Sequence, residues 1–162
     1  MLIGTCYFQA ARYYYAASGR SGPRGFLTYA WLIPSVSAAT LMAYASQAKG
    51  TPSRLAVRYL LRVYCIDVSR DARIEGPLFL PHPHGITIGI GVRVGKRVAL
   101  YQNVTLGTDH ASGYPVVEDD ATIFVGSVVV GSLIVESGTK IAANSVVAPT
   151  RLLRGVRGGS SN

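Results

Sequence analysis

Two of the three histidines in this chain lie in one short stretch, LPHPHGITIG, at residues 82 and 84. A neutral imidazole titrates near physiological pH, so a histidine held in a defined position can take a proton from a hydroxyl group. The third histidine, His110, follows Asp109 in the stretch GTDHASGYP. Proton transfer is therefore one hypothesis for these residues, and ordinary solvated surface histidines are the other.

A period of six residues defines the elements that must position these histidines. Branched aliphatic residues recur at every sixth position in two runs: Val68, Ile74, Leu80, Ile86, Val92, Val98 and Val104, then Val117, Ile123, Val129, Val135, Ile141 and Val147. A helix does not produce this spacing, whereas a solenoid whose six-residue units each form a short strand and a corner does. The pattern predicts a parallel β-helix over residues 67–149.

Two positions of each six-residue unit are predicted to lie inside the β-helix or at its corners. The first position is that of the repeating aliphatic residues. The fifth position is the second inward or corner site, and it is mostly small or aliphatic, as in Ala72, Ile90, Ala121 and Ser127. His84 falls at this position and is expected to have a structural role. The period breaks between residues 104 and 117, which predicts a loop over residues 107–115. On a rigid solenoid such a loop is a favoured place for a binding site.

Residues 1–66 are predicted to form a helical amino-terminal segment. Apolar residues recur at helical spacing over residues 1–17 and 53–64, and two further short helices are expected at 26–33 and 36–48. This segment has seven basic residues and no acidic one: Arg12, Arg20, Arg24, Lys49, Arg54, Arg58 and Arg62. It would favour phosphates or an anionic membrane surface, although a solvated cationic face is the commoner explanation. No nucleic-acid partner is expected.

The uncharged run over residues 25–48 is long enough to cross a bilayer, but Pro34 and several polar residues favour short buried or surface-lying helices. Peripheral membrane contact remains open. The two cysteines, Cys6 and Cys65, suggest no disulfide scaffold, so the cytoplasm, including the inner surface of its membrane, is the expected compartment. Residues 150–162 are rich in glycine and serine and are expected to form a flexible tail.

The segment LPHPHGITIGIGVRVGKRVALYQNVTLG, with the repeats that follow it, resembles the hexapeptide-repeat acyltransferases. Within them it is most similar to the serine acetyltransferases and their short relatives that modify surface polysaccharides. The elements His-x-x-Gly-Ile-x-Ile-Gly and Val-Thr-Leu-Gly carry the resemblance, which covers about residues 66–148. It implies a left-handed β-helix, a homotrimer and transfer of an acetyl group from acetyl-CoA to a hydroxyl group between neighbouring subunits.

The resemblance also implies roles for individual residues. His82 falls on the family's catalytic base, and Asp67 falls on the aspartate that orients it, with a capping role as the alternative for Asp67. No metal is expected at this site. The positions that match contacts to acetyl-CoA are Gly107, Val125 and Ala143 near the pantetheine and thiol, and Lys140 and Arg151 near the phosphates.

The chain departs from the serine acetyltransferase pattern where that family holds its amino acid. Pro81 replaces an acidic residue, and Gly113-Tyr114 replaces an Arg-His pair. We therefore expect a sugar hydroxyl of a surface polysaccharide or its precursor in preference to L-serine, with Asp109, His110 and Tyr114 contacting the acceptor. Serine acetylation in cysteine biosynthesis is the first alternative.

Two alternatives come from other classes of protein. A non-catalytic β-helix scaffold would be indifferent to the loss of His82. A zinc enzyme on the same scaffold would use three histidines, but His82, His84 and His110 are spaced by two and by 26 residues, unlike ligands supplied by neighbouring coils.

Overall fold

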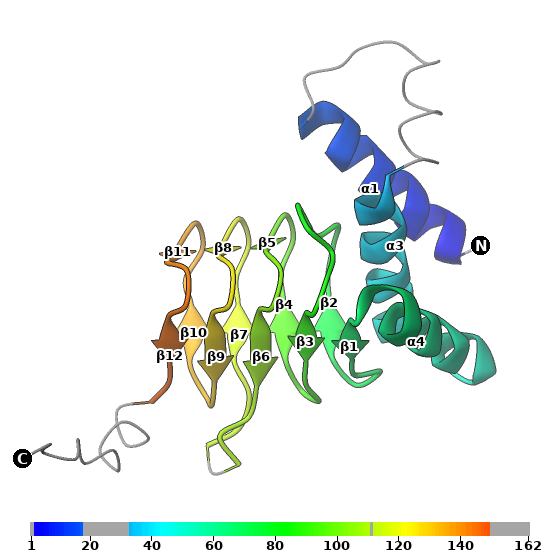
Figure 1. The fold of residues 1–162 in the computed structure, drawn as a ribbon. Coiled ribbons are helices and arrows are strands. Elements are labelled where there is room, and N and C mark those ends of the chain that lie inside the picture. The colour runs from blue at the N-terminus through cyan, green and yellow to red at the C-terminus, as the bar shows by residue number, and fades with distance from the viewer. Residues whose placement is uncertain (1, 18–32, 111, 150–162) are drawn as a thin grey trace, which may run out of the picture.

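The computed structural model describes residues 2–17, 33–110 and 112–149. Within these ranges three helices come first: α1 (Leu2–Ala17), α3 (Pro34–Gln47) and α4 (Thr51–Tyr64). Figure 1 shows them gathered at one end of a stack of short strands. The expected helix at 26–33 lies almost entirely outside the described residues, as does the expected tail at 150–162.

Twelve short strands follow the helices within the described residues. They are β1 (Asp67–Val68), β2 (Arg73–Ile74), β3 (Thr87–Ile88), β4 (Arg93–Val94), β5 (Ala99–Leu100), β6 (Thr105–Gly107), β7 (Val116–Val117), β8 (Thr122–Ile123), β9 (Val128–Val130), β10 (Ile134–Val135), β11 (Lys140–Ile141) and β12 (Val146–Val147).

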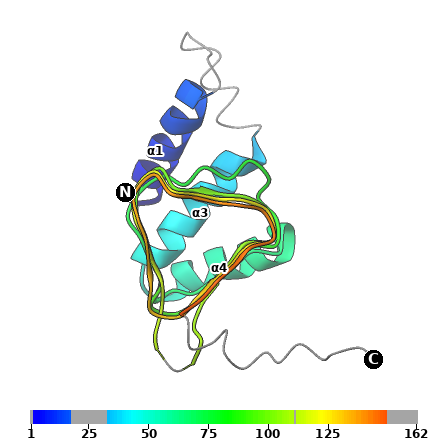
Figure 2. The ribbon, with the colours of Figure 1, turned by 90° about the vertical axis from the view of Figure 1, so that its left-hand side faces the viewer.

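These strands form three parallel sheets. Sheet A has the order β1-β3-β6-β9-β12, sheet B has the order β10-β7-β4-β2, and sheet C has the order β11-β8-β5. Because the chain visits sheets A, B and C in turn, each complete circuit after the first adds one strand to each face of a triangular prism. In the first circuit an isolated bridge between Phe79 and Ala99 takes the place of a strand of sheet C. Figure 2 shows this triangular outline along the prism axis. The parallel β-helix predicted from the period of six is confirmed.

The interior of the prism is aliphatic and continues into the helices. Every strand except β12 buries its second residue, as with Val94, Leu100 and Leu106, which are all 0% exposed. Helix α3 packs on β1 and β2 and closes the end of the prism with buried residues such as Val36 and Met42. The prediction of a short buried helix at 36–48 is confirmed. No helix in the described part of the chain has the length and apolar character needed to cross a membrane.

The unbroken spacing of six conceals a shift in phase. Val68 and Ile74 are second strand residues, but Ile86 comes before its strand, and Ile88 occupies the strand position instead. The pairing shows the cause: Asp67 pairs with Thr87, 20 residues later, whereas a regular coil has 18. The two extra residues lie between Phe79, which pairs with Ala99, and β3.

This shift corrects the predictions for the fifth position of each unit. Ala72, Ala121 and Ser127 are buried as expected, but Ile90 is 57% exposed. His84 is also exposed, so it lies at a corner and not inside. The predicted loop at 107–115 is present, because Thr105 pairs with Val128, 23 residues later, which leaves five residues beyond a regular coil. It leaves the corner between sheets A and B (Figures 1 and 2).

Candidate active site

The turns that lead from sheet C to sheet A stack in a column along one edge of the prism, which we call the C–A edge. Backbone hydrogen bonds connect them: the N–H of Asn103 donates to the carbonyl of His84 at 3.0 Å, and the N–H of Gly126 donates to that of Gln102 at 3.1 Å. The N–H of Asn144 continues the column by donating to the carbonyl of Val125 at 2.8 Å. The turn of His82, Val125 and the turn of Ala143 therefore lie along a single edge.

Each turn of the C–A edge contains one residue with left-handed backbone. These residues are Gly85 (φ 66°), Asn103 (φ 59°), Gly126 (φ 69°) and Asn144 (φ 55°). Glycine and asparagine adopt this region more readily than other residues. The amide oxygen of Asn103 lies where a side chain at Gly85 would begin, and Asn144 covers Gly126 in the same way. The asparagine side chains thus pack directly over the glycines of the preceding coil.

The turn at residues 81–85 is longer than the other turns of this edge, because it contains the two extra residues of the first coil. The N–H of His84 donates to the carbonyl of His82 at 2.8 Å, and the N–H of Gly85 donates to the carbonyl of Tyr64 at 3.1 Å. These bonds hold the backbone of the turn against the end of α4. Both histidine side chains are exposed, so an imidazole is accessible to a substrate here.

Asp67 lies on the strand beside this turn. Helix α4 ends at Tyr64, and the left-handed backbone of the next residue, Cys65 (φ 52°), turns the chain into β1. The N–H of Asp67 then donates to the carbonyl of Ile86 at 2.9 Å, while the Asp67 side chain is exposed. Among the described residues no hydrogen bond or ion pair joins the side chains of Asp67 and His82. The 20-residue coil thus brings Asp67 next to the base of the turn, and its orienting role remains a prediction.

Gln102 is a residue of this edge that the sequence did not single out. Its side-chain oxygen Oε1 is buried and has no hydrogen-bond partner among the residues that the structure describes. Buried polar atoms are nearly always paired, so this oxygen is an exception. Gln102 lies between the turn of His82 and Val125 in the column. The signal that could have identified it was its position two residues after a strand, which Val125 and Ala143 share.

Tyr64 supports the candidate site from the helical side. Burial raises the pKa of its phenol, Tyr59 raises it further, and a hydrogen bond with Ser37 lowers it. The hydroxyl of Tyr64 is therefore protonated at neutral pH. Tyr64 contributes to the site through its backbone carbonyl, which accepts the N–H of Gly85.

The residues predicted to bind acetyl-CoA separate into two groups. Val125 is half-buried and Ala143 exposed on the C–A edge, and Lys140 is exposed on β11 of sheet C. Gly107 ends β6 at the corner between sheets A and B, where its carbonyl accepts the N–H of Gly131 at 3.2 Å. Arg151 lies outside the described residues.

The predicted acceptor residues lie in the loop at 107–115. The carboxylate of Asp109 accepts the N–H of Ser112 at 2.6 Å and also its hydroxyl, and the hydroxyl oxygen of Ser112 accepts the N–H of Ser132 at 2.9 Å. His110 is exposed with left-handed backbone (φ 60°). The Tyr114 ring lies over Gly91, where an added Cβ would be 2.6 Å from it.

Two of these residues thus have structural contacts: Asp109 braces the loop, and Tyr114 packs on the prism. The loop and the turn of His82 leave different corners of the triangle (Figure 2). A single chain therefore does not bring its own His82 and its own loop into one site.

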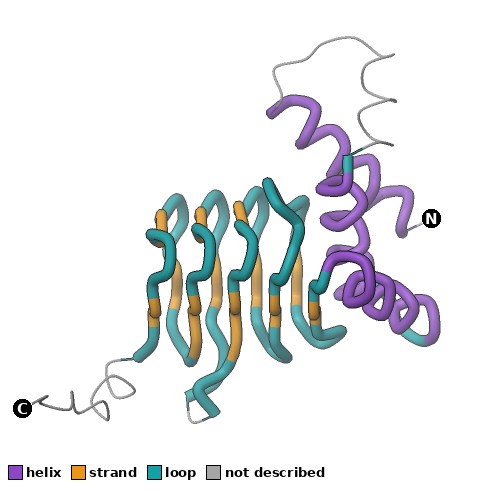
Figure 3. Tube along the Cα trace, in the orientation of Figure 1, coloured by secondary structure: helices purple, strands orange, loops and turns teal. Residues whose placement is uncertain are grey.

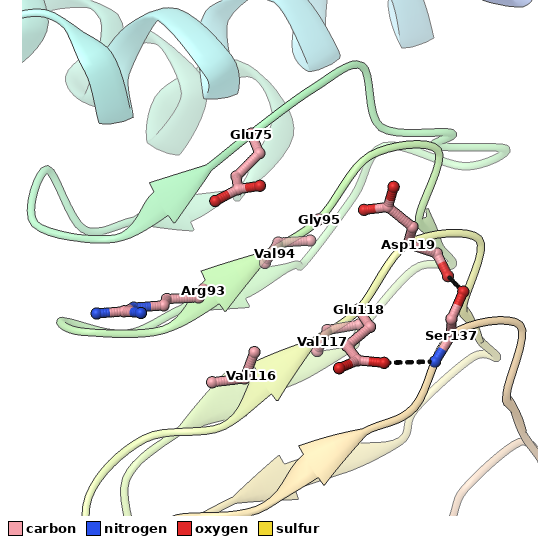
Figure 4. Close-up of a pocket in the computed structure, with 9 residues that line it drawn as sticks. All are labelled: Glu75, Arg93, Val94, Gly95, Val116, Val117, Glu118, Asp119 and Ser137. Carbon is pink, nitrogen blue, oxygen red and sulfur yellow. Dashed lines mark hydrogen bonds between the residues drawn. The ribbon is translucent and has the colours of Figure 1, made fainter.

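A shallow groove of about 390 Å³ lies on sheet B, away from the C–A edge (Figure 4). Glu75, Arg93 and Glu118 are among its lining residues. One carboxylate oxygen of Glu118 accepts the N–H of Ser137 at 3.0 Å. None of the predicted site residues that the structure describes lines this groove. Within the described ranges, no three His, Cys, Asp or Glu side chains gather as a metal site would require.

Solved structures identify the class of fold. A serine acetyltransferase from Neisseria gonorrhoeae, in complex with serine, matches with a TM-score of 0.75 and 20% identity over 90% of this chain and 62% of its own. A serine acetyltransferase in complex with CoA matches with a TM-score of 0.72 and 20% identity over 89% of this chain and 61% of its own. The fold is thus a left-handed β-helix with amino-terminal helices, as predicted.

Sequence comparison gives the particular resemblance. The serine acetyltransferase of Bacillus licheniformis is 39% identical over 85 residues, which are 51% of this chain and 39% of that protein. That of Bacillus subtilis is 38% identical over the same shares. No protein-family model matches the chain. The chain spans about two fifths of the length of these curated relatives, and it is serine acetyltransferase-like in sequence and in fold.

The comparisons bear on the predicted acceptor. The relatives and structures named above are serine acetyltransferases, and one of the structures contains serine. They support the serine alternative better than the sugar acceptor that we expected from the sequence.

Proposed function

We propose that this chain is an acetyl-CoA-dependent O-acetyltransferase in which His82 is the general base. The observation that carries the proposal is the column on the C–A edge, where the exposed turn of His82 stacks in line with Val125 and Ala143. Coils of a β-helix stack about 4.8 Å apart, so this edge offers an elongated ligand a straight track that ends at an imidazole.

The proposed chemistry needs a proton acceptor and then a proton donor at one place. Acetyl-CoA supplies an acetyl group activated as a thioester. His82 accepts the proton of the acceptor hydroxyl while the hydroxyl oxygen forms its bond to the acetyl carbonyl carbon. His82 then returns this proton to the sulfur as the carbon–sulfur bond breaks. Asp67 keeps the imidazole in the required tautomer and stabilises its charged form.

The residues of the C–A edge fit the donor substrate. Gln102 lies in the same column, between the turn of His82 and Val125. Lys140 is exposed on β11 and would meet the phosphates as a cation. Gly107 and the loop lie at the other corner, so we place them in the same site as contributions from a neighbouring copy, with a homotrimer as the assembly.

L-serine is the acceptor that we propose first, because the relatives that the chain matches are named for it. A sugar hydroxyl is the second candidate, and it rests on an observation of the site. Pro81 carries no charge, and the loop GTDHASGYP contains no lysine or arginine to hold a carboxylate. Free serine would have few charged contacts beside His82.

The test measures CoA release from acetyl-CoA with L-serine and with a panel of sugars. His82→Ala should lower turnover by about 10² or more, because it removes general base catalysis. The matched control is His84→Ala, which changes an exposed histidine of the same turn. Asp67→Asn should lower turnover less than His82→Ala does, because the imidazole remains.

The outcomes separate the candidates. Saturable acetylation of L-serine without activity on sugars would assign the chain to serine acetylation, and the reverse pattern would assign it to a sugar. An undiminished rate in His82→Ala would refute the mechanism. Failure to bind acetyl-CoA at all would leave the β-helix as a scaffold.

A further inference from the structure

Helix α4 carries two parallel ridges on its outer face. Arg54, Arg58 and Arg62 form a basic ridge, and Leu55, Tyr59 and Val63 form an apolar ridge beside it. Residues four apart lie above one another on a helix, so each set makes a continuous row. The apolar side chains are well exposed, at 61% for Leu55, 50% for Tyr59 and 52% for Val63.

The inner face of α4 already has its partners. Ser53, Ala56 and Leu60 are buried, and α4 packs on α3 and β1. The hydroxyl of Ser53 donates to the carbonyl of Ala45 at 2.9 Å and accepts a hydrogen bond from Arg70 at 3.2 Å. The orientation of the helix is therefore set by its inner face, and the two ridges are directed outward.

The basic ridge has no carboxylate partner within the described ranges. Residues 1–66 contain no acidic residue, and none of the ion pairs found in the described part of the chain involves Arg54, Arg58 or Arg62. Three arginines with no carboxylate partner in the described part of the chain, beside three exposed apolar side chains, fit an occupant that is anionic and apolar at once. A second copy that presented the same face would instead oppose arginine to arginine.

We propose that the outer face of α4 binds the surface of an anionic phospholipid membrane. A helix with adjacent basic and apolar faces lies in the plane of the interface, with its apolar side chains at the acyl boundary and its cations at the phosphates. Here the apolar ridge enters the headgroup region while the basic ridge meets lipid phosphates. This inference goes beyond acetyl transfer and does not depend on it.

Membrane binding through α4 would also orient the β-helix relative to the membrane surface. Helix α4 leads through Cys65 and Ile66 directly into β1 (Figure 3). The first coil of the prism, which carries the turn of His82, would be held at the membrane while later coils extend away. An acceptor carried by a lipid could then reach the C–A edge without leaving the bilayer.

Co-sedimentation of the full chain with vesicles tests the proposal without acetyl-CoA. We expect binding to phosphatidylcholine vesicles that contain about 30% phosphatidylglycerol, loss of binding at about 0.5 M salt, and little binding to pure phosphatidylcholine. The variant Arg54→Gln/Arg58→Gln should lower the partition coefficient about thirtyfold, since each arginine near an anionic surface contributes about a fivefold factor. The matched control is Arg73→Gln/Arg93→Gln, which removes two exposed arginines of sheet B.

A second variant, Leu55→Gln/Tyr59→Ser, tests the apolar ridge. It should weaken vesicle binding and leave acetyl transfer to a soluble acceptor unchanged. Equal binding to neutral and anionic vesicles, equal losses in the two arginine variants, or no binding at all would overturn the proposal. So would a change in oligomeric state of Leu55→Gln/Tyr59→Ser without any vesicle binding by the wild type, because the face would then join copies of this chain. None of these outcomes bears on His82.

Discussion

The corners of the prism depend on single residues with left-handed backbone. Along the C–A edge glycine and asparagine alternate, so that Asn103 covers Gly85 and Asn144 covers Gly126. The glycine has no Cβ, which leaves room for the asparagine amide of the next coil. This alternation keeps neighbouring turns close together and determines how straight the track beside His82 is.

Two glycine substitutions separate these effects. Gly126→Ala introduces a Cβ where the Asn144 amide lies, in a left-handed residue (φ 69°). Gly138→Ala has a similar φ of 72° but no heavy atom within 4 Å of the added carbon. We expect Gly138→Ala to lower the free energy of unfolding by about 1 kcal/mol through backbone strain.

The loss in Gly126→Ala should be about 1–3 kcal/mol greater, because the corner is also overpacked. Urea denaturation monitored by circular dichroism measures both variants. Equal losses would show that Asn144 moves aside without cost.

At the scale of elements, the loop at 107–115 is braced to the next coil through Ser112. Its hydroxyl group donates to Asp109 within the loop and accepts the N–H of Ser132 in the next coil. One side chain thus connects the loop to the neighbouring coil. A loop held in this way can present His110 in a defined position, whereas an unbraced loop of this length would sample many.

Ser112→Ala should therefore loosen the loop without unfolding the prism. We expect faster amide hydrogen exchange over residues 107–115 and a change of only about 1 kcal/mol in the free energy of unfolding, since two hydrogen bonds of a partly exposed group are lost. The matched control is Ser137→Ala, whose hydroxyl donates to the carbonyl of Asp119 at 2.8 Å in another turn. Unchanged exchange in the loop would show that the brace contributes nothing.

At the scale of the whole molecule, the candidate site is divided between two corners of the prism. The turn of His82 lies on the C–A edge, and the loop leaves the corner between sheets A and B. Closed symmetric assemblies can unite two such surfaces by placing one copy's edge against another copy's corner. A trimer accomplishes this with three equivalent sites.

Sedimentation equilibrium should therefore give a mass of three chains for the active species. Mixed assemblies add a sharper test: His82→Ala chains combined with chains that lack residues 108–114 should recover activity, because some sites then take the imidazole from one chain and the loop from the other. A stable monomer with full activity would contradict this arrangement.

The sequence by itself determined the repeating architecture of this protein. One aliphatic residue in every six specifies a β-helix, because each short strand must bury a side chain and each corner must turn. Helical spacing likewise identified α1 and α4, the uncharged run around Pro34 identified α3, and the break in the period identified the loop. The motif around His82 identified the family resemblance. All of these are local features that spacing along the chain records.

Only the tertiary structure decided the phase of the coils and the surroundings of His82. Each six-residue unit has two inward positions that are two residues apart. An insertion of two residues before β3 therefore moves the aliphatic residues from one inward position to the other, and the period of six stays intact. Hydrogen-bond register alone distinguishes the two, and it places Asp67 against Ile86 and leaves Gln102 with a buried, unpaired oxygen. These relations join residues about 20 positions apart, and they exist only once neighbouring coils have stacked.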